Sequence, residues 1–314
     1  MKKSILFSLI SISLSLTGQS TLKNFKGEKV DCKYHLNQDR LNGLYTSYYK
    51  NGKKKAEGEF ENNLRVGTWK LWDYSGKVSV QREYINPFSF KNKSIAKNKK
   101  SNSTPYNLSY NDDKYITYFE VDEKIIVLHE RYWRYISKNK NPLLFENDRL
   151  FKCLEKNILA ENIKKYTADN DEFLKEDKTK HNLKDLEIIG YNVKEDYFFD
   201  NKRFVSETRI IGICPVAFNK QTKETTDLYW LYFPETRKYV AQEKIQSNEI
   251  PEKIKSLDDL FFFRYFSGEI YKKSNVLIKN LSEYKTSKEI AEKIEIKKIE
   301  NEHNLWFYFA EGKK

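Results

Sequence analysis

The stretch that decides the fold reads GYNVKEDYFFD at residues 190–200, TRIIGICPVAF at 208–218 and DLYWLYFP at 227–234. Val193–Phe199 mixes polar and aromatic side chains, whereas Arg209–Phe218 is almost continuously apolar, as is typical of a central strand covered on both faces. Asp227–Phe233 is rich in aromatics, and the following Pro234 has no N–H to give to a strand ladder. The polar segment 219–226 suits a hairpin loop. We therefore predict three consecutive strands, which form the core sheet of the main domain.

Two helices are predicted before these strands. Apolar residues recur at helical spacing over Ile125–Lys138, which predicts a helix that ends before Pro142. Asp148 can cap a second helix, whose apolar stripe reaches Ile158.

Two more helices are predicted after the strands. The segment Ser256–Asp259 has the form of a capping box and starts a phenylalanine-rich helix that reaches Ile270. Thr286–Glu289 can cap a last helix, in which Ile290 and Ile294 lie one turn apart. Helices on both sides of a contiguous set of strands favour the α+β class, with an antiparallel or mixed sheet flanked by helices, over alternating βαβ units.

The composition favours a globular protein of one large or two ordinary domains. Aromatic residues make up 15% of the 314 residues, which provides buried area for a core although 32% of the residues are charged. The formal net charge is +12, and the excess is N-terminal, because residues 21–113 hold 18 basic and 10 acidic side chains. A basic region of this kind could contact phosphate, lipid head groups, anionic glycans or an acidic protein, or could serve solubility alone.

The N-terminal segment 1–20 has the pattern of a secretory signal peptide. Two lysines precede a Leu/Ile/Ser run over Ile5–Leu16, which is shorter than the roughly 20 residues of a membrane-spanning helix. Small residues follow, with cleavage after Gly18 or Ser20, and no cysteine is present there for lipid attachment. A buried N-terminal helix is the alternative. The pattern predicts an exported chain with no transmembrane segment after processing, periplasmic in a bacterium with two membranes.

Segment 41–86 contains an internal repeat with an offset of 24 residues. The matching pairs are Gly43/Gly67, Tyr45/Trp69, Tyr48/Trp72, Gly52/Gly76 and Lys53/Lys77. Each copy reads as a strand, a turn in which glycine supplies the positive φ, and a second strand. The pattern resembles MORN-type repeats, which implies a small all-β hairpin module that presents a binding surface. Two copies are few for an independent solenoid, so we expect the module to dock on something.

Polar segments flank this repeat. Residues 21–40 are weakly patterned, and residues 87–113 combine lysines with Asn and Ser as a basic flexible linker does. The main domain then occupies residues 114–314. The lysines could bind nucleic acid, but export makes nucleic acid a poor candidate partner.

The sequence predicts no catalytic, cofactor or metal site. The four histidines lack metal-ligand spacing. His35 and His181 suit a surface loop, His129 suits the flank of the predicted helix, and His303 suits a structural hydrogen bond. No nucleophile-elbow, zinc-protease or phosphate-binding glycine motif occurs in the sequence. Glu195-Asp196 and Asp200 could suggest acid–base chemistry, but Asp196 and Asp200 would lie about 13 Å apart along a strand. That separation exceeds the roughly 5–9.5 Å of glycosidase carboxylates, so these carboxylates suit a hydrophilic strand face or an ion pair with Arg209. We expect Arg209 and Arg237 to anchor carboxylates within the domain or at a partner interface.

Cysteine usage does not predict a disulfide framework. Cys32, Cys153 and Cys214 form no C-x-x-C motif, and an odd number cannot close into pairs. Cys214 suits a buried position in its apolar strand. Cys32 and Cys153 could pair in an oxidising compartment.

An ordered series of motifs over residues 121–308 resembles the GldN (PorN) family of gliding motility and type IX secretion. The motifs are Arg131-Tyr-Trp-Arg-Tyr-Ile136 with Asn141-Pro142, Tyr166 with Asp171-Glu-Phe173, Lys194–Asp200, Arg209–Pro215, Tyr229–Arg237, Ser256–Asp259 with Arg264-Tyr-Phe266, and Glu302–Trp306. Each string is ordinary by itself, but seven in this order are specific. The repeats and the basic linker depart from the usual pattern of the family, which leaves open whether this chain is a main ring subunit or a paralogue.

The resemblance implies a non-enzymatic periplasmic component without catalytic, cofactor or metal residues. It implies a multimeric ring assembled with an outer-membrane lipoprotein of the GldK/PorK type, placed on the outer-membrane side, and contact with periplasmic proteins of the GldM/PorM type. Two alternatives stand beside it. One is a stand-alone exported envelope-binding protein that uses the basic MORN-like module, and the other is an exported hydrolase, for which no convergent catalytic set can be assembled.

Overall fold

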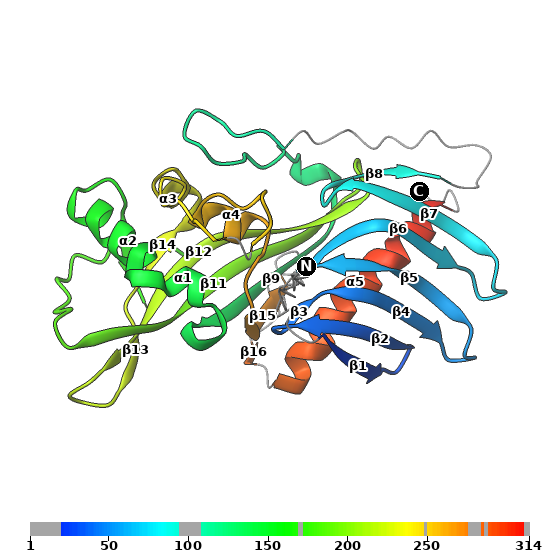
Figure 1. Ribbon diagram of the computed structural model, residues 1–314, viewed down its shortest axis with the longest axis horizontal. Helices are drawn as coiled ribbons and strands as arrows, with labels where there is room; N and C mark the ends of the chain where they lie inside the picture. Colours follow the sequence, from blue (N-terminus) through cyan, green and yellow to red (C-terminus); the bar gives the residue numbers. More distant parts are fainter. Residues whose placement is uncertain are drawn as a thin grey trace, which may run out of the picture.

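The computed structural model describes residues 20–93, 108–168, 172–247, 250–275, 284–285 and 288–310. It contains two eight-stranded antiparallel sheets. Figure 1 shows the N-terminal sheet, coloured blue to cyan, on one side of the molecule and the C-terminal sheet, coloured green to orange, on the other. The last helix, in red, lies across the N-terminal sheet. The predicted signal segment falls outside the described residues, apart from Ser20.

The N-terminal sheet is a meander in the order β1-β2-β4-β5-β6-β7-β8, with β3 paired to β2. Its strands are β1 (Thr21–Lys26), β2 (Val30–Asn37), β3 (Arg40–Leu41), β4 (Gly43–Tyr49), β5 (Lys54–Glu61), β6 (Leu64–Trp72), β7 (Val78–Asn86) and β8 (Ser89–Asn92). The two copies of the repeat form the hairpins β4–β5 and β6–β7. Gly52 and Gly76 occupy the equivalent turns with φ of 81° and 95°, a backbone region that glycine adopts without strain. Assignment of these hairpins to the MORN type stays a prediction.

This sheet is larger than the repeat alone. β1 and β2 lie in the segment 21–40, which the sequence left weakly patterned, and β8 lies within the segment 87–113. Most of that second segment, residues 94–107, lies outside the described residues.

The C-terminal sheet has the order β10-β14-β12-β11-β9-β15-β16, with β13 paired to β12. Its strands are β9 (Ile126–Ser137), β10 (Lys165–Thr167), β11 (Leu186–Asp200), β12 (Val205–Asn219), β13 (Thr225–Asp227), β14 (Tyr229–Tyr232), β15 (Glu269–Asn275) and β16 (Tyr284–Lys285). β11, β12 and β14 are the three strands predicted from the opening stretch, and their prediction is confirmed.

The predicted helix over Ile125–Lys138 is wrong, because this segment forms β9 between β11 and β15. As an interior strand it is covered on both faces, and Tyr132, Trp133, Arg134 and Ile136 are all buried. Its apolar residues therefore do not alternate with polar ones, and they match a helical spacing by coincidence.

Short helices join the strands of this second sheet. They are η1 (Glu123–Ile125), η2 (Lys138–Lys140), α1 (Pro142–Phe145), η3 (Glu146–Asp148), α2 (Arg149–Leu159), α3 (Phe233–Val240) and α4 (Leu257–Phe262). Figure 1 shows α1 to α4 gathered at the C-terminal sheet. The predicted helix α2 is confirmed, although Asp148 at its N-cap makes no capping hydrogen bond. The Ser256 capping box is confirmed, but α4 ends at Phe262 and Ile270 belongs to β15.

Helix α5 (Lys288–Ala310) is the last described element. The prediction of a last helix is confirmed, while its predicted cap at Thr286 lies outside the described residues. Ile296, Ile299 and Trp306 of α5 share one hydrophobic cluster with the inner face of the N-terminal sheet. Among the described residues, no helix has both the length and the apolar character needed to cross a membrane.

All three cysteines are free and buried, in different parts of the molecule. Cys32 lies in β2 of the first sheet, whereas Cys153 lies in α2 beside the second. The suggested pairing of these two thiols is therefore wrong. Burial raises the pKa of Cys32 to about 12 and that of Cys153 to about 11, so both stay protonated near neutrality.

Candidate functional site

The junction between the N-terminal sheet and α5 joins distant parts of the chain through aromatic rings. Trp69 of β6 contacts Trp306 and His303 of α5 with ring centroids 6.5 and 5.5 Å apart. Tyr45 of β4 lies 6.0 Å from His303. Tyr45 and Trp69 occupy the same position in the two copies of the repeat, and both are fully buried. The repeated aromatics thus form the surface on which α5 packs.

Buried ion pairs join the same two elements. Lys55 Nζ lies 2.6 Å from Glu300 Oε2, and Arg65 Nη1 lies 2.6 Å from Glu302 Oε2. The Arg65 guanidinium also lies 4.9 Å from the ring centroid of Trp69 and 5.3 Å from that of Trp306. An ion pair removed from water stabilises a protein only when its geometry is good and its remaining hydrogen-bonding groups are satisfied. These two ion pairs therefore favour one position of α5 on the sheet.

His303 completes this junction as a buried neutral ring. Its Nδ1 lies 3.3 Å from Glu300 Oε1, and its Nε2 lies 3.4 Å from Arg65 Nη2. An arginine can only donate, so Nε2 accepts and the proton is assigned to Nδ1. Burial, together with the charges of Arg65 and Lys55, lowers the pKa of His303 against the opposing effect of Glu300.

A second buried charge cluster lies where α5 meets the C-terminal sheet. Glu195 of β11 is fully buried and accepts from Arg134 Nε at 3.1 Å and from Arg264 Nη2 at 2.9 Å. Arg134 also pairs with Glu295 of α5 at 2.5 Å, and Lys298 Nζ lies 3.6 Å from Glu295. Helix α5 is therefore tied to both sheets by charged groups.

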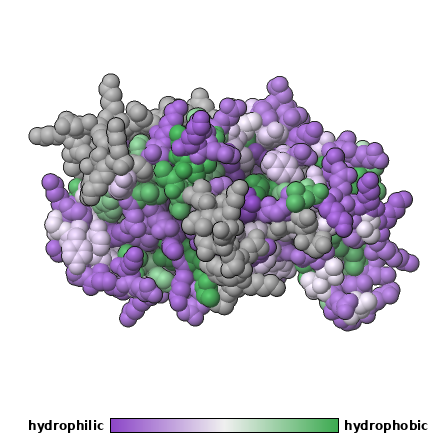
Figure 2. Space-filling view, turned by 180° about the vertical axis from the view of Figure 1, so that it is seen from behind, coloured by the Kyte–Doolittle hydropathy of each residue, from purple (hydrophilic) through white to green (hydrophobic). Residues whose placement is uncertain are grey.

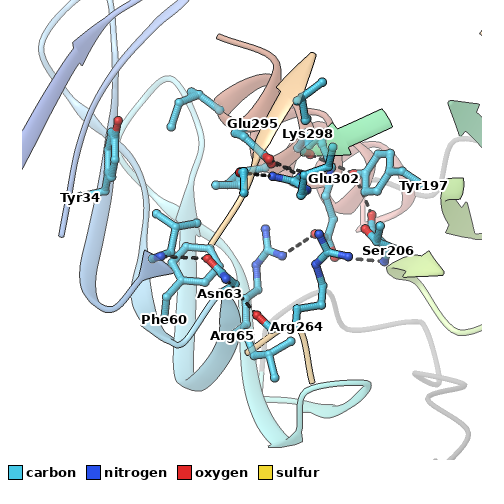
Figure 3. A pocket seen from close by; sticks show the side chains of 18 of the residues that line it. Tyr34, Phe60, Asn63, Arg65, Tyr197, Ser206, Arg264, Glu295, Lys298 and Glu302 are labelled. Carbon is cyan, nitrogen blue, oxygen red and sulfur yellow. Dashed lines mark hydrogen bonds and ion pairs between the residues drawn. The ribbon is translucent and has the colours of Figure 1, made fainter. Parts of the chain in front are cut away.

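A cavity of about 330 Å³ opens between these two clusters. Its lining comes from both sheets, from the segment after α4 and from α5, and includes Phe60, Asn63, Arg65, Arg264, Glu295 and Lys298. Figure 3 shows the side chains of Arg65 and Arg264 at the cavity, with Glu295, Lys298 and Glu302 above them in the view. A volume of this size falls at the lower end of small-molecule pockets.

The carboxylates singled out from the sequence do not converge. Asp196 accepts from Arg131 Nε at 2.7 Å, Asp200 pairs with Arg203, and Glu195 takes part in the cluster beneath the cavity. Each carboxylate has its own cationic partner, so the three form structural ion pairs.

Arg209 anchors a carboxylate within the domain, but not one of the carboxylates suggested from the sequence. Arg209 pairs with Glu207 at 2.7 Å, although it stands opposite Asp196 in the strand register. Arg131 on the neighbouring strand β9 reaches Asp196 instead. Arg237, for which a carboxylate partner was predicted, makes two hydrogen bonds to Asp258 at 2.8 and 2.7 Å.

The four histidines lie in four different places. His35 contacts the carbonyl of Leu44, and His181 pairs with Asp177. His129 pairs with Asp196 and lies in strand β9, so the expected helix flank is wrong. His303 lies on α5 itself, beside Glu300. Within the described residues, no group of three His, Cys, Asp or Glu side chains could hold a metal ion.

Sequence reasoning missed the polar residues of α5 that form the junction. Lys298, Glu300 and Glu302 are less than a tenth exposed, yet such residues are expected on the solvent side of a helix. The repeat contained a signal for this junction. Lys55 and Arg65 lie next to the buried residues Ala56 and Leu64 on strands of the repeat.

The outer surface is mostly hydrophilic. Figure 2 shows hydrophilic residues over much of one face, with hydrophobic residues in small groups between them. Leu159 and Leu174 are each 80% exposed, and Tyr74 is 63% exposed. Scattered single residues of this kind are normal on a protein surface.

One helix packs between two sheets, and charged groups are paired inside the junction. The chain belongs to the GldN family, described as gliding motility associated protein GldN, whose sequence pattern matches residues 137–307. This family places it among the components of gliding motility and type IX secretion. The match runs from the end of β9 into α5 and leaves out the N-terminal sheet. No curated protein matches the chain.

Proposed function

We propose that the chain is a non-enzymatic, periplasmic structural component of the type IX secretion and gliding machinery, which acts by assembling with a ring lipoprotein. The match to the GldN family over residues 137–307 is the observation that carries this proposal. The proposal includes export through the N-terminal segment 1–20 and a place on the outer-membrane side through the lipoprotein.

The interior supports an assembly role for physical reasons. Catalytic sites bring titratable groups together with perturbed pKa values around a space for substrate. Here the buried carboxylates Glu195, Glu300 and Glu302 are each held by arginine, lysine or histidine donors. Such pairing suits a molecule whose task is to keep its shape under load from its neighbours.

Crosslinking in living cells tests the proposed partnership. The full chain carries a C-terminal epitope tag at its own locus, and a crosslinker confined to the envelope is applied before recovery on antibody. We expect the lipoprotein of the GldK/PorK type to be recovered with the chain. An unrelated tagged periplasmic protein serves as the control. Recovery of the chain without this lipoprotein, at crosslinker levels that join known neighbours, would contradict the proposal.

The N-terminal module could alternatively bind an anionic envelope component directly. Its inner face is occupied by α5, so this role falls to the outer face and the hairpin turns, where Lys50, Lys53 and Lys77 lie. Exchange of these three lysines for glutamine separates the two ideas. Loss of binding to isolated anionic envelope material, with binding to the lipoprotein unchanged, would favour the direct contact.

A further inference from the structure

The cavity between the two sheets is bordered by a buried cluster of charged groups. Arg134, Arg264, Glu295 and Lys298 line it, and Arg134 and Arg264 both donate to the fully buried Glu195. Arg134 and Lys298 also pair with Glu295.

Each neighbouring carboxylate of the lining already has a partner. Glu207 is held by Arg203 and Arg209, and Asp39 and Glu269 are held by Lys140. Glu302 is paired with Arg65, and Glu292 accepts from the hydroxyl of Tyr34.

Two guanidinium N–H groups in the lining have unused donor capacity. Arg264 Nη1 and Arg65 Nε are buried, and neither has an acceptor among the described residues. Both side chains line the cavity (Figure 3). A buried donor without an acceptor is destabilising, and guanidinium groups are well matched to the two oxygens of a carboxylate.

Apolar side chains line the cavity beside these donors. Phe60 and Leu64 come from the N-terminal sheet, and Phe262 and Phe266 come from α4 and the segment after it. All four of these side chains are buried. A ligand that fits this lining has one carboxylate and an apolar body next to it.

We propose that this cavity binds an amphipathic monocarboxylate, with Arg264 and Arg65 as the carboxylate donors and the four apolar side chains around its body. The chemistry is shared by a free small carboxylic acid and by a polypeptide chain that ends in a hydrophobic residue. Because the lining comes from both sheets and α5, such a ligand would bridge the two halves of the molecule. The proposal is independent of the assembly role.

Calorimetric titration of the full chain at pH 7 tests this proposal with three probes. They are N-acetyl-phenylalanine, a hexapeptide that ends in phenylalanine with a free carboxylate, and the same hexapeptide with a C-terminal amide. We expect at least one free acid to bind and the amide to bind at least tenfold more weakly, because the amide lacks the charge that the donors require. Binding of N-acetyl-phenylalanine alone indicates a small-molecule ligand, and binding of the acid peptide indicates a polypeptide terminus.

Substitutions at Arg264 test the assigned donor. We expect R264Q to weaken binding of the free acid at least tenfold and R149Q, at a surface arginine of α2 paired with Glu146, to leave it unchanged. R264K keeps the charge beside Glu195 but loses the planar fork, and it replaces R264Q if that variant does not fold. The proposal is overturned if no free acid binds at about 10 mM, or if acid and amide bind equally. It is also overturned if both Arg264 variants bind the free acid as the unaltered chain does.

Discussion

Arg65 shows how a single charged residue stabilises the junction between the first sheet and the last helix. Its guanidinium lies among the rings of Phe60, Trp69 and Trp306 and pairs with Glu302 at 2.6 Å. The side chain of Glu302 is 4% exposed. Loss of either partner leaves a charge in surroundings that solvate it poorly.

We expect Arg65→Met to lower the free energy of unfolding by about 3–5 kcal/mol, because it leaves Glu302 buried without its cation. The double variant with Glu302→Gln should recover a large part of this loss. Urea unfolding followed by tryptophan fluorescence measures both. Lys93→Met, which removes an exposed pair with Glu83, is the control and should change stability by about 1 kcal/mol or less. Equal effects of Arg65→Met and Lys93→Met would contradict this account.

His303 gives the junction a dependence on pH. Its pKa in the folded protein is lowered, so below about 6.5, the ordinary value of the unfolded chain, the unfolded state takes up a proton that the folded state does not. Stability is therefore fully present above pH 6.5 and falls as the pH decreases through the window down to the lowered pKa.

We expect the free energy of unfolding to be smaller at pH 5.5 than at pH 7.5, with His303→Gln reducing this difference. Urea titrations at both pH values provide the measurement. His35→Gln, at an exposed histidine, should keep the full difference. The pKa of Glu300 is held low by His303 and Lys55 against the effect of burial. Protonation of Glu300 therefore lowers the free energy of unfolding only at more acidic pH. An unchanged pH difference in His303→Gln would exclude the ring as its source.

Sequence reasoning at the residue scale identified His303 as a structural hydrogen-bonding residue, and the structure places it in that role. It could not identify Glu300 and Glu302 as buried, because a carboxylate shows its partner only after folding. The same limit explains why the suggested partner of Arg209 is not the observed one. The strand register places Asp196 opposite Arg209, but Arg131 of the neighbouring strand β9 pairs with Asp196 instead.

At the scale of elements, the close packing of β5 and β6 depends on Gly58. A Cβ atom at this position would lie 2.1 Å from a ring atom of Trp69, far inside contact distance. The φ of Gly58 is not positive, so space and not backbone strain requires glycine there. Trp69 in turn contacts His303 and Trp306 of α5, and its displacement would disturb the docking of the helix.

We expect Gly58→Ala to destabilise the protein by about 1–3 kcal/mol, as overpacking of a core commonly does, and to change the near-UV circular dichroism of the tryptophans. Thr68→Ala, at an exposed position on the adjacent strand, is the control and should leave both unchanged. A Gly58→Ala variant with normal stability and spectrum would show that Trp69 can move without cost.

The strands of the C-terminal sheet were predictable where their apolar runs were bounded by turn residues and proline, as in β11, β12 and β14. β9 was not, because both of its faces are covered and no alternation remains. The length of α5 was also hidden, since Lys298, Glu300 and Glu302 interrupt its apolar stripe on the buried side.

At the scale of the whole molecule, the first sheet and the last helix hold together two regions that are distant in sequence. The GldN pattern covers α5 but not the sheet on which α5 lies. The expectation that the N-terminal module docks on something is met within the chain itself. The sequence could not predict that α5 is this partner, because a contact between the two ends of a chain produces no periodic pattern of residues in either segment.

We expect the two regions to remain associated after the chain is cut between them. A specific protease site placed within residues 94–107 allows cleavage of the folded protein, and size-exclusion chromatography then reports whether the fragments elute together. They should coelute even in 1 M NaCl, because buried pairs such as Lys55–Glu300 are screened less than surface pairs. Separate elution in mild buffer would contradict a strong α5 junction.

The location of α5 at the far end of the chain has a consequence for biogenesis. The strands of the first sheet leave the ribosome or the export channel long before the helix that covers their aromatic face. Until Lys288–Ala310 arrives, Tyr45 and Trp69 have no helix to pack against, and exposed apolar surface of this kind invites chaperones or aggregation. A chain that ends before α5 therefore leaves the aromatic face of its N-terminal sheet uncovered.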